Sequence, residues 1–511
     1  MRIAERLLAP IEGLLGALTD PTRRERTMAL VLAGYALIWA LYGAIAKGSQ
    51  DINFDMGEAV GWSRELALGT PKHPPMSAWL VRVWFTVFPL ADWAYYLLAI
   101  VLATLALWIA WRIAADYLEA EKRVVGLALL TLLPFFNFHA LKYNANTVLI
   151  PFWAATTWWF LRSFETRSVI YAALAGLGAA GAMLGKYWSI FLLAGLGLAA
   201  LCDPRRGAYF RSPAPWLTAA VGALALAPHA AWIIGNGFSS FGYALTVHAA
   251  TSVLMPVKEA AGYLVGTAAY MAIPVVLALV AARPSLRALA DTLRPAEPRR
   301  RTVLIAFAAP ILLPVIVAIV AQFGIVSLWN MSAMTLLPVV LLSSPLLTVT
   351  RPAAVRILAL AVALPLVMLA ASPVIAIVIH RQGVGHHATH YRLLAAAIDQ
   401  AWRAATDKPM RLIGSNTNLV NGVVFYLADQ PSTLVLGGAA ATPWASEARV
   451  AREGVALVCP VADVGCVQQI EALAADKPTA KRSEVELSRR YAGWNDPAVR
   501  YVIIVLPPRT T

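Results

Sequence analysis

Long apolar stretches separated by short charged loops constrain this chain more than any other feature. A transmembrane helix needs about 20 predominantly apolar residues to cross a bilayer. Only 14% of the residues are charged and 59% are hydrophobic, whereas soluble globular proteins carry about 25% charged residues. We therefore predict a polytopic α-helical membrane protein with about 11 transmembrane helices. The apolar runs lie near residues 28–46, 91–114, 124–139, 145–161, 169–185, 187–201, 216–234, 259–282, 303–321, 333–349 and 357–379.

The charges in the loops predict how these spans are oriented. With the N-terminus in the cytoplasm, the cytoplasmic segments contain 21 Lys and Arg, and the opposite loops before residue 380 contain 7. Such an excess is typical of cytoplasmic loops, and an odd number of spans places the residues after 380 outside. The net charge of +14 is thus explained by topology. We expect no nucleic-acid partner, because no basic, aromatic-rich soluble domain is evident.

The two ends of the chain differ from its membrane part. Residues 1–27 are basic and amphipathic, as in a helix on the cytoplasmic membrane surface, and no cleavable signal peptide is evident. Residues 28–380 would form the membrane domain, and residues 381–511 a periplasmic soluble α/β domain, because strand and helix patterns alternate there. Its helices are expected at 391–405, 418–428, 443–453 and 462–475, and its strands at 411–415, 432–436, 455–459, 484–490 and 499–506.

The cysteines give a limited signal. Three cysteines in 511 residues exclude a disulfide-rich scaffold. Cys459 and Cys466 both lie in the predicted outer domain, where they can pair, because disulfides form outside the cytoplasm. The alternative is two buried thiols, since spacing does not show geometry. No His, Cys and Asp cluster has metal-ligand spacing, so we expect no metal site.

Candidate catalytic groups gather in residues 47–90, here called the first loop. Asp55 precedes a predicted helix on which Glu58 shares one face with Trp62 and Glu65, because their spacing follows the helical period. Arg64 lies on the same helix, and His73 precedes two prolines, which favour an extended turn. Residues 76–88 are expected to form a helix on the membrane surface.

Polar residues also lie where predicted spans end on the outer side. Lys142, Asn144 and Asn146 open one span, and Lys186 with Tyr187 interrupts an otherwise uncharged run. Ionisable residues at membrane depth are usually functional. Lys186 has two interpretations: its side chain reaches the interface beside aromatic rings, or it holds an anion.

His229 ends another span on that side, and a lone histidine is more often structural than catalytic. A carboxylate can take a proton from an acceptor hydroxyl, and Lys or Arg can hold a phosphate. This combination points to an enzyme that uses a lipid-phosphate-linked donor.

The first loop resembles that of the GT-C glycosyltransferases, and more narrowly the bacterial branch of the protein O-mannosyltransferase superfamily. That branch includes transferases that add aminoarabinose or galacturonic acid to lipid A and core lipopolysaccharide. The Asn144-Ala-Asn146 span start and the Gly185-Lys186-Tyr187 break are also similar to this branch, and the resemblance covers about residues 28–380. The matching first-loop residues are Asp55, Glu58, Ala59, Gly69, His73, Pro74 and Pro75.

The resemblance implies a GT-C fold, a donor of polyprenyl phosphate bearing one sugar, and no nucleotide or other cofactor. The mechanism we expect is direct displacement at the anomeric carbon with inversion. Asp55 would be the base or acceptor-orienting group and Glu58 the second candidate, because Met56 and Gly57 separate two acids that are adjacent in many relatives. The expected phosphate-binding residues are Lys186, Arg64, His73 and Lys142. Those expected to contact substrate are Asn144, Asn146, Tyr187 and His229.

The expected acceptor is a glycolipid, lipid A or core lipopolysaccharide, at the periplasmic face of the bacterial inner membrane. The expected partners are thus this donor, this acceptor and membrane lipids, with the chain acting as a monomer. A protein O-glycosyltransferase of the same superfamily is an alternative. A transporter or flippase of lipid-linked sugars is another, although transporters carry ionisable residues near mid-membrane, where few occur here.

Overall fold

The computed structural model describes residues 2–438 and 441–509. The chain forms two compact units, each built from segments that are far apart in the sequence. The first unit contains Met1–Ala40, Leu97–Leu141 and Ala145–Leu369, and the second contains Leu41–Tyr96, Lys142–Asn144 and Ala370–Thr511. The first loop therefore belongs to the same unit as the C-terminal segment. The predicted boundary at residue 380, in contrast, assigns the first loop to the membrane domain and separates it from the C-terminal segment.

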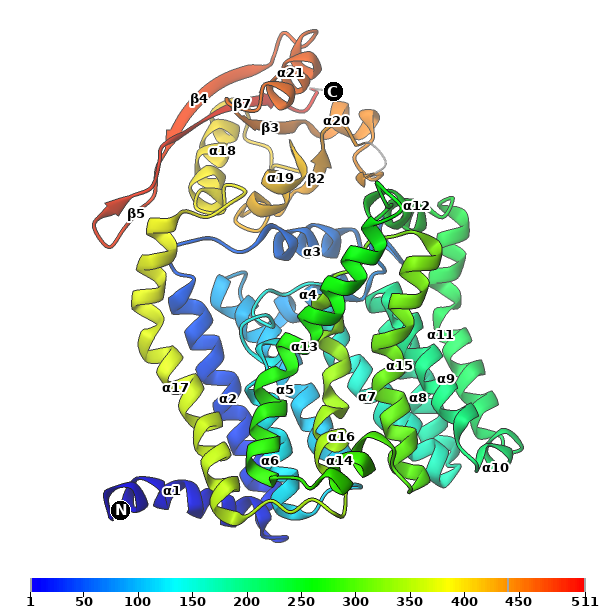
Figure 1. Ribbon diagram of the computed structural model, residues 1–511. Coiled ribbons are helices and arrows are strands. Elements are labelled where there is room, and N and C mark those ends of the chain that lie inside the picture. The colour runs from blue at the N-terminus through cyan, green and yellow to red at the C-terminus, as the bar shows by residue number, and fades with distance from the viewer. Residues whose placement is uncertain (1, 439–440, 510–511) are drawn as a thin grey trace. The chain divides into compact units, whose positions relative to one another are not determined.

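Helices form almost all of the first unit (Figure 1). The helices whose residues belong wholly or mostly to it are α1 (Arg2–Thr19), α2 (Arg24–Ala46), α5 (Asp92–Ala114), α6 (Ala120–Thr131), η1 (Pro134–Phe136), α7 (Ala145–Thr166), α8 (Val169–Gly185), η2 (Tyr187–Ser189), α9 (Ile190–Cys202), α10 (Arg206–Phe210), α11 (Ala214–Gly235), α12 (Ser239–Val247), α13 (Met255–Ala282), α14 (Leu286–Leu293), α15 (Pro298–Ala321), η3 (Ser327–Leu336), α16 (Leu337–Leu342) and α17 (Arg351–Gln382).

The prediction of a polytopic membrane protein is confirmed. In the described part of the chain, six helices are long and apolar enough to cross a membrane, namely α2, α5, α11, α13, α15 and α17. Shorter apolar helices, among them α8, η2 with α9, and η3 with α16, account for further predicted runs. Every predicted run coincides at least in part with a helix.

Two predicted spans end earlier than expected. The helix in the run 124–139 stops at Thr131, because Pro134 follows and a proline disfavours helical geometry in the residue before it. The run 333–349 contains only the end of the 3-10 segment η3 and the short helix α16, which ends at Leu342 shortly before Pro345. Both helices are thus shortened by prolines, an effect that the hydrophobicity of the run alone does not predict.

Glycines allow the helices of the first unit to pack closely. A Cβ atom on Gly176 of α8 would lie 2.5 Å from the Thr218 carbonyl oxygen of α11, and one on Gly181 would lie 2.4 Å from the Phe152 ring of α7. Membrane helices without a hydrophobic driving force between them associate through such small residues.

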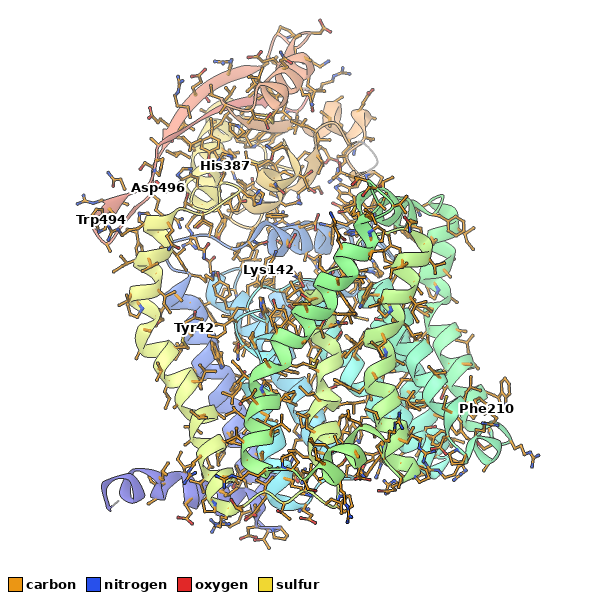
Figure 2. All side chains as sticks on the ribbon, viewed as in Figure 1. Tyr42, Lys142, Phe210, His387, Trp494 and Asp496 are labelled. Atoms are coloured by element: carbon orange, nitrogen blue, oxygen red, sulfur yellow. A yellow bond between two sulfur atoms is a disulfide. The ribbon has the colours of Figure 1, made fainter. Side chains whose placement is uncertain are left out.

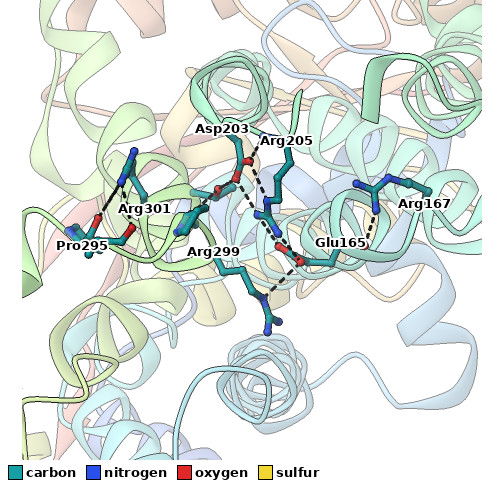
Figure 3. A network of polar contacts seen from close by, with 10 residues as sticks. Glu165, Arg167, Asp203, Arg205, Pro295, Arg299 and Arg301 are labelled. Carbon is teal, nitrogen blue, oxygen red and sulfur yellow. Dashed lines mark hydrogen bonds and ion pairs between the residues drawn. The ribbon is translucent and has the colours of Figure 1, made fainter. Parts of the chain in front are cut away.

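Charged residues join the loop ends of three helices in the first unit (Figure 3). Arg205 donates to the Glu165 carboxylate at 2.9 Å and to Asp203 at 2.8 Å. Arg299 of α15 lies 3.5 Å from the same Glu165, and Thr302 donates to Asp203. Arg205 and Arg299, two of the basic residues on which the predicted topology rests, are therefore paired locally with acids.

The second unit combines the first loop with an α/β fold. The first loop contains α3 (Phe54–Glu65) and α4 (Met76–Val87), and the prediction of a helix at 76–88 is confirmed. The C-terminal segment contains α18 (Tyr391–Ala405), β1 (Leu412–Ser415), α19 (Thr417–Val423), β2 (Ser432–Val435), α20 (Glu447–Glu453), β3 (Val455–Pro460), α21 (Val464–Ala474), β4 (Lys481–Leu487), β5 (Arg490–Tyr491), β6 (Trp494–Asn495) and β7 (Val499–Leu506).

The C-terminal sheet has strand order β2-β1-β3-β7-β4. β1 pairs in parallel with β2 and β3, whereas β7 pairs antiparallel with β3 and β4. Helices α18 and α19 lie on one face of the sheet, and α21 lies on the other (Figure 1). Their buried side chains pack against the strands on each face. This three-layer arrangement agrees with the predicted α/β class.

Cys459 on β3 and Cys466 on α21 form a disulfide, with Cα atoms 5.8 Å apart. We expect both thiols of membrane-embedded protein to resist alkylation until a reductant is added. The exposed Cys202 thiol is free and serves as the internal control, because it should react without reductant in detergent. Alkylation of all three cysteines without reductant would contradict the disulfide. Mass spectrometry of the labelled peptides provides the measurement.

The first loop packs tightly on the C-terminal segment within the second unit. A Cβ atom on Gly57 of α3 would lie 1.8 Å from the Asn421 carbonyl oxygen of α19, so only glycine fits there. Asp51 accepts hydrogen bonds from the Arg392 backbone N–H at 2.9 Å and from the Arg489 guanidinium at 2.6 Å. Asp51 is fully desolvated and is therefore a structural anchor of the loop, because buried carboxylates need such partners.

Candidate functional site

The predicted catalytic carboxylate Asp55 lies in the first turn of α3. Asn53 caps this helix, because its side-chain oxygen accepts a hydrogen bond from the Asp55 backbone N–H at 3.1 Å. Lys142, which is labelled in Figure 2, is the partner of this carboxylate. Its ammonium lies 2.7 Å from the Asp55 carboxylate and 5.8 Å from the centre of the Phe54 ring. Both charged side chains remain partly exposed, so the pair is accessible to a substrate.

Glu58 lies one turn further along α3 in a different environment. Its side chain is buried, Lys72 donates to its Oε2 atom at 2.8 Å, and Asn421 donates to its Oε1 atom at 3.3 Å. Burial raises the pKa of the Glu58 carboxyl, and the charge of Lys72 opposes this shift. The two acids thus differ: Asp55 is reachable, whereas Glu58 is enclosed and doubly hydrogen-bonded.

Removing the cation that pairs with Glu58 should destabilise the second unit. We expect Lys72→Met to lower the free energy of unfolding by about 3–5 kcal/mol, because it leaves a buried carboxylate without its counter-charge. The loss should shrink as pH falls, since protonation of Glu58 removes the unpaired charge. Thermal unfolding in detergent at several pH values measures this difference, and Glu58→Gln combined with Lys72→Met should restore stability. Equal unfolding of Lys72→Met and wild type at neutral pH would contradict the prediction.

His73 forms part of a turn next to Glu58. Its backbone carbonyl accepts hydrogen bonds from the Thr70 N–H at 3.0 Å and the Thr70 hydroxyl at 2.8 Å. Its ring meets the Trp62 ring edge-on, with centroids 6.0 Å apart. The His73-Pro74-Pro75 turn thus places the imidazole beside α3, in the same unit as Asp55.

The guanidinium of Arg64 binds backbone instead. Its Nη2 donates to the Val424 carbonyl at 3.0 Å, and its Nη1 donates to the Pro431 carbonyl. Desolvation by burial lowers the pKa of Arg64 to about 9. This position argues against the predicted phosphate-binding role and for a positioning role, in which Arg64 fixes the end of α3 against the C-terminal segment.

In the first unit, Lys186 lies at the break between α8 and η2. Its ammonium donates to the Asn146 side-chain oxygen at 3.0 Å and lies 4.4 Å from the centre of the Trp329 ring. The backbone leaves helical geometry at Lys186, whose N–H still bonds the Ala182 carbonyl. Two predicted residues, Lys186 and Asn146, are therefore in direct contact, and together with an indole face they fix the position of the cation.

Tyr187 and His229 are also brought together. The Tyr187 hydroxyl lies 3.0 Å from His229 Nε2, and the Tyr187 ring stacks on His229 and on Phe241. Asn144, in contrast, belongs to the short segment Lys142–Asn144 of the second unit. The predicted site residues thus form two groups, one around Asp55 in the second unit and one around Lys186 in the first.

Sequence reasoning missed Trp329 and His248. The ring of His248 meets the Trp329 ring edge-on at 5.0 Å. Burial and the charge of Lys186 lower the pKa of His248, so this imidazole lies within electrostatic reach of the ammonium. Neither residue belongs to a recognisable sequence motif. Their place in the site becomes visible only in the structure, where η3 packs near the break between α8 and η2. Within residues 2–438 and 441–509, no cluster of His, Cys, Asp and Glu could hold a metal ion.

Comparison with known proteins agrees with this architecture. Residues 72–232 match the family model described as dolichyl-phosphate-mannose-protein mannosyltransferase. Crystal structures of ArnT from Cupriavidus metallidurans, in the apo state and bound to undecaprenyl phosphate, superpose with a TM-score of 0.60. They are 13% and 14% identical to this chain and cover 93% of it and 97% of ArnT. The chain has the GT-C fold.

A curated sequence relative of this GT-C chain is the lipopolysaccharide core galacturonosyltransferase RgtB of Rhizobium johnstonii. The two are 29% identical over 225 residues, which cover 43% of this chain and 44% of RgtB. The match therefore spans less than half the length of that relative. The predicted resemblance to transferases that modify lipid A and core lipopolysaccharide is confirmed, and the GT-C chain is a multi-pass membrane protein.

Proposed function

We propose that this protein is a glycosyltransferase that moves one sugar from a polyprenyl-phosphate donor to lipid A or core lipopolysaccharide. The reaction would take place at the periplasmic face of the inner membrane. The observation that carries this proposal is the Lys186 ammonium, which Asn146 and Trp329 hold at a helix break. A positioned cation of this kind suits the phosphate of a lipid-linked donor. The resemblance to RgtB and ArnT, whose names concern core lipopolysaccharide and undecaprenyl phosphate, supports the same chemistry.

The proposed reaction is a displacement at the anomeric carbon with inversion. The bond between this carbon and the phosphate oxygen breaks, and a bond to an acceptor oxygen forms. Lys186 stabilises the negative charge that grows on the departing phosphate, and such stabilisation is often the largest catalytic contribution. Asp55 takes the proton of an acceptor hydroxyl. A phosphate acceptor is already ionised, and Asp55 then orients it.

The remaining predicted residues support these two groups. We propose that Lys142, which pairs with Asp55, sets the position and charge of that carboxylate and releases it when an anionic substrate arrives. Tyr187 and His229 would form the wall beside Lys186. His73 and Asn144 are proposed substrate contacts in the second unit. Glu58 is enclosed, and its role would be to hold Lys72 and Asn421 in place.

Mass spectrometry of envelope lipids from a deletion strain and its complemented counterpart tests the proposal. We expect the deletion to remove one sugar mass from lipid A or core and to cause accumulation of the lipid-linked donor. Unchanged lipopolysaccharide together with loss of glycosylated proteins would indicate a protein O-glycosyltransferase. A donor trapped on the cytoplasmic side would indicate a flippase. Either result would overturn the proposed activity.

A further inference from the structure

The C-terminal sheet changes its winding direction between β1 and β3. These strands are parallel neighbours, with Ile413 opposite Ala456. The helix after β1, α19, packs on one face of the sheet, and the helix after β3, α21, packs on the other (Figure 1). In open α/β sheets, such a switch point leaves a crevice outside the carboxyl ends of the two strands, where ligands bind.

Polar side chains occupy this switch point. Asn416 directly follows β1, Asp463 lies shortly after β3, and Asn416 Nδ2 donates to the Asp463 carboxylate at 3.1 Å. Tyr501 on β7 pairs with Pro460, the last residue of β3, so Tyr501 stands at the same edge of the sheet, and its hydroxyl contacts two histidine rings. His387 Nδ1 is 2.9 Å from that hydroxyl. Amide, carboxylate and phenol groups from the ends of β1, β3 and β7 therefore lie close to an imidazole from the segment before α18.

The segment before α18 adds a more exposed rim. His386 Nδ1 lies 2.9 Å from Asn418 Nδ2, and the His386 side chain is exposed while Asn418 is half-buried. Both His386 and His387 have left-handed backbone conformations, with φ of 60° and 61°. Non-glycine residues adopt this region at a cost, so the surrounding structure must hold the two histidines in this conformation.

This polar edge is continuous with the Asp55 group inside the second unit. The Phe54 ring contacts the His386 ring, with centroids 5.1 Å apart. The same Phe54 ring lies 5.8 Å from Lys142, the partner of Asp55. A molecule bound along Asn418 and His386 would therefore reach Asp55 after passing one aromatic side chain.

We infer that the β1–β3 switch point binds the hydroxyl-rich glycan part of the acceptor and presents it to Asp55. This inference rests on the proposed function, because it assumes that Asp55 receives an acceptor. Neighbouring amides, imidazoles and a carboxylate supply both donors and acceptors of hydrogen bonds, which sugar hydroxyls require. The C-terminal segment is thus an acceptor-recognition element.

Binding of a lipid-free glycan to the full-length protein in nanodiscs tests the inference. The probe is the deacylated core oligosaccharide of lipopolysaccharide from the deletion strain, titrated calorimetrically. The test variants are Asn418→Ala and His386→Gly, because glycine keeps the left-handed backbone without strain. The matched control is Gln400→Ala, which removes an exposed amide from α18. Thermal unfolding of each variant checks that the fold is retained.

We expect each test variant to raise the Kd for the oligosaccharide about tenfold, equivalent to about 1.4 kcal/mol, and Gln400→Ala to leave it unchanged. The KM for the acceptor should rise by the same factor, with kcat and the KM for the donor unchanged. Unaltered Kd and KM in both variants would overturn the inference. Transfer by wild type without oligosaccharide binding would also overturn it and leave the proposed function intact. Specific binding without any transfer would instead refute the proposed function alone.

Discussion

Asp55→Asn is expected to reduce transfer to a hydroxyl acceptor by about 10²–10⁴-fold, the usual contribution of a general base. The asparagine keeps the size of the side chain. The substitution does not affect the N-terminal cap of α3, because the side chain of Asn53 supplies that cap. Lys142 loses its ionic partner but remains partly exposed, so the fold should persist. Turnover of a polyprenyl-phosphate-linked sugar in nanodiscs measures the effect.

Asp399→Asn provides the matched control for that variant. Asp399 lies on α18 and forms a half-exposed pair with Arg403 at 3.4 Å, so its neutralisation should leave transfer unchanged. Wild-type turnover in Asp55→Asn with no turnover in Glu58→Gln would move the role of base to Glu58. A loss below tenfold in Asp55→Asn, with an ionised phosphate as acceptor, would limit Asp55 to orientation.

Lys186→Met is expected to lower kcat by about 10²–10³-fold, equivalent to about 2.7–4 kcal/mol of transition-state stabilisation. The ammonium is held by the Asn146 oxygen and the Trp329 ring, so its charge is positioned before the donor arrives. Methionine keeps the length and apolar body of the side chain. Single-turnover rates at saturating donor separate this effect on the chemical step from weaker donor binding.

Lys258→Met is the control for the cation, because Lys258 is exposed near the start of α13. Lys186→Arg should restore part of the rate, since it keeps the charge but alters the geometry. Unchanged kinetics in Lys186→Met would support the alternative interpretation, in which the side chain merely reaches the membrane interface.

The local patterns of the sequence predict the elements of this protein well. The amphipathic period of α18 predicts its bounds, residues 391–405, because one buried face recurs along the helix. The buried strands β1 and β3 are predicted by short apolar runs bounded by turn residues. The predicted helix ends are wrong where a proline stops a helix inside an apolar run, as before Pro134 and Pro345.

The candidate site is less accessible to prediction, because its contacts join distant segments. Asn421 reaches Glu58 across 363 residues of sequence, and Arg64 reaches Pro431 across 367. Trp329 meets Lys186 only because η3 packs near the α8–η2 break. A residue type and its spacing indicate that Lys186 and Asp55 are chemically suited to a role, but only packing reveals which partners hold them.

The tie between Asp51 and Arg489 has a consequence for biosynthesis. The two residues are 438 positions apart, yet Arg489 donates to the buried Asp51 carboxylate at 2.6 Å. During translation the first loop emerges long before this partner exists, and the closure of so long a segment is slow. The loop that carries Asp55 therefore remains incompletely packed until the segment that contains Arg489 has been synthesised. A nonsense mutation before the codon for Arg489 would then do more than remove part of the C-terminal sheet. It would leave the candidate catalytic loop without its Arg489 partner, incompletely packed and exposed to proteases.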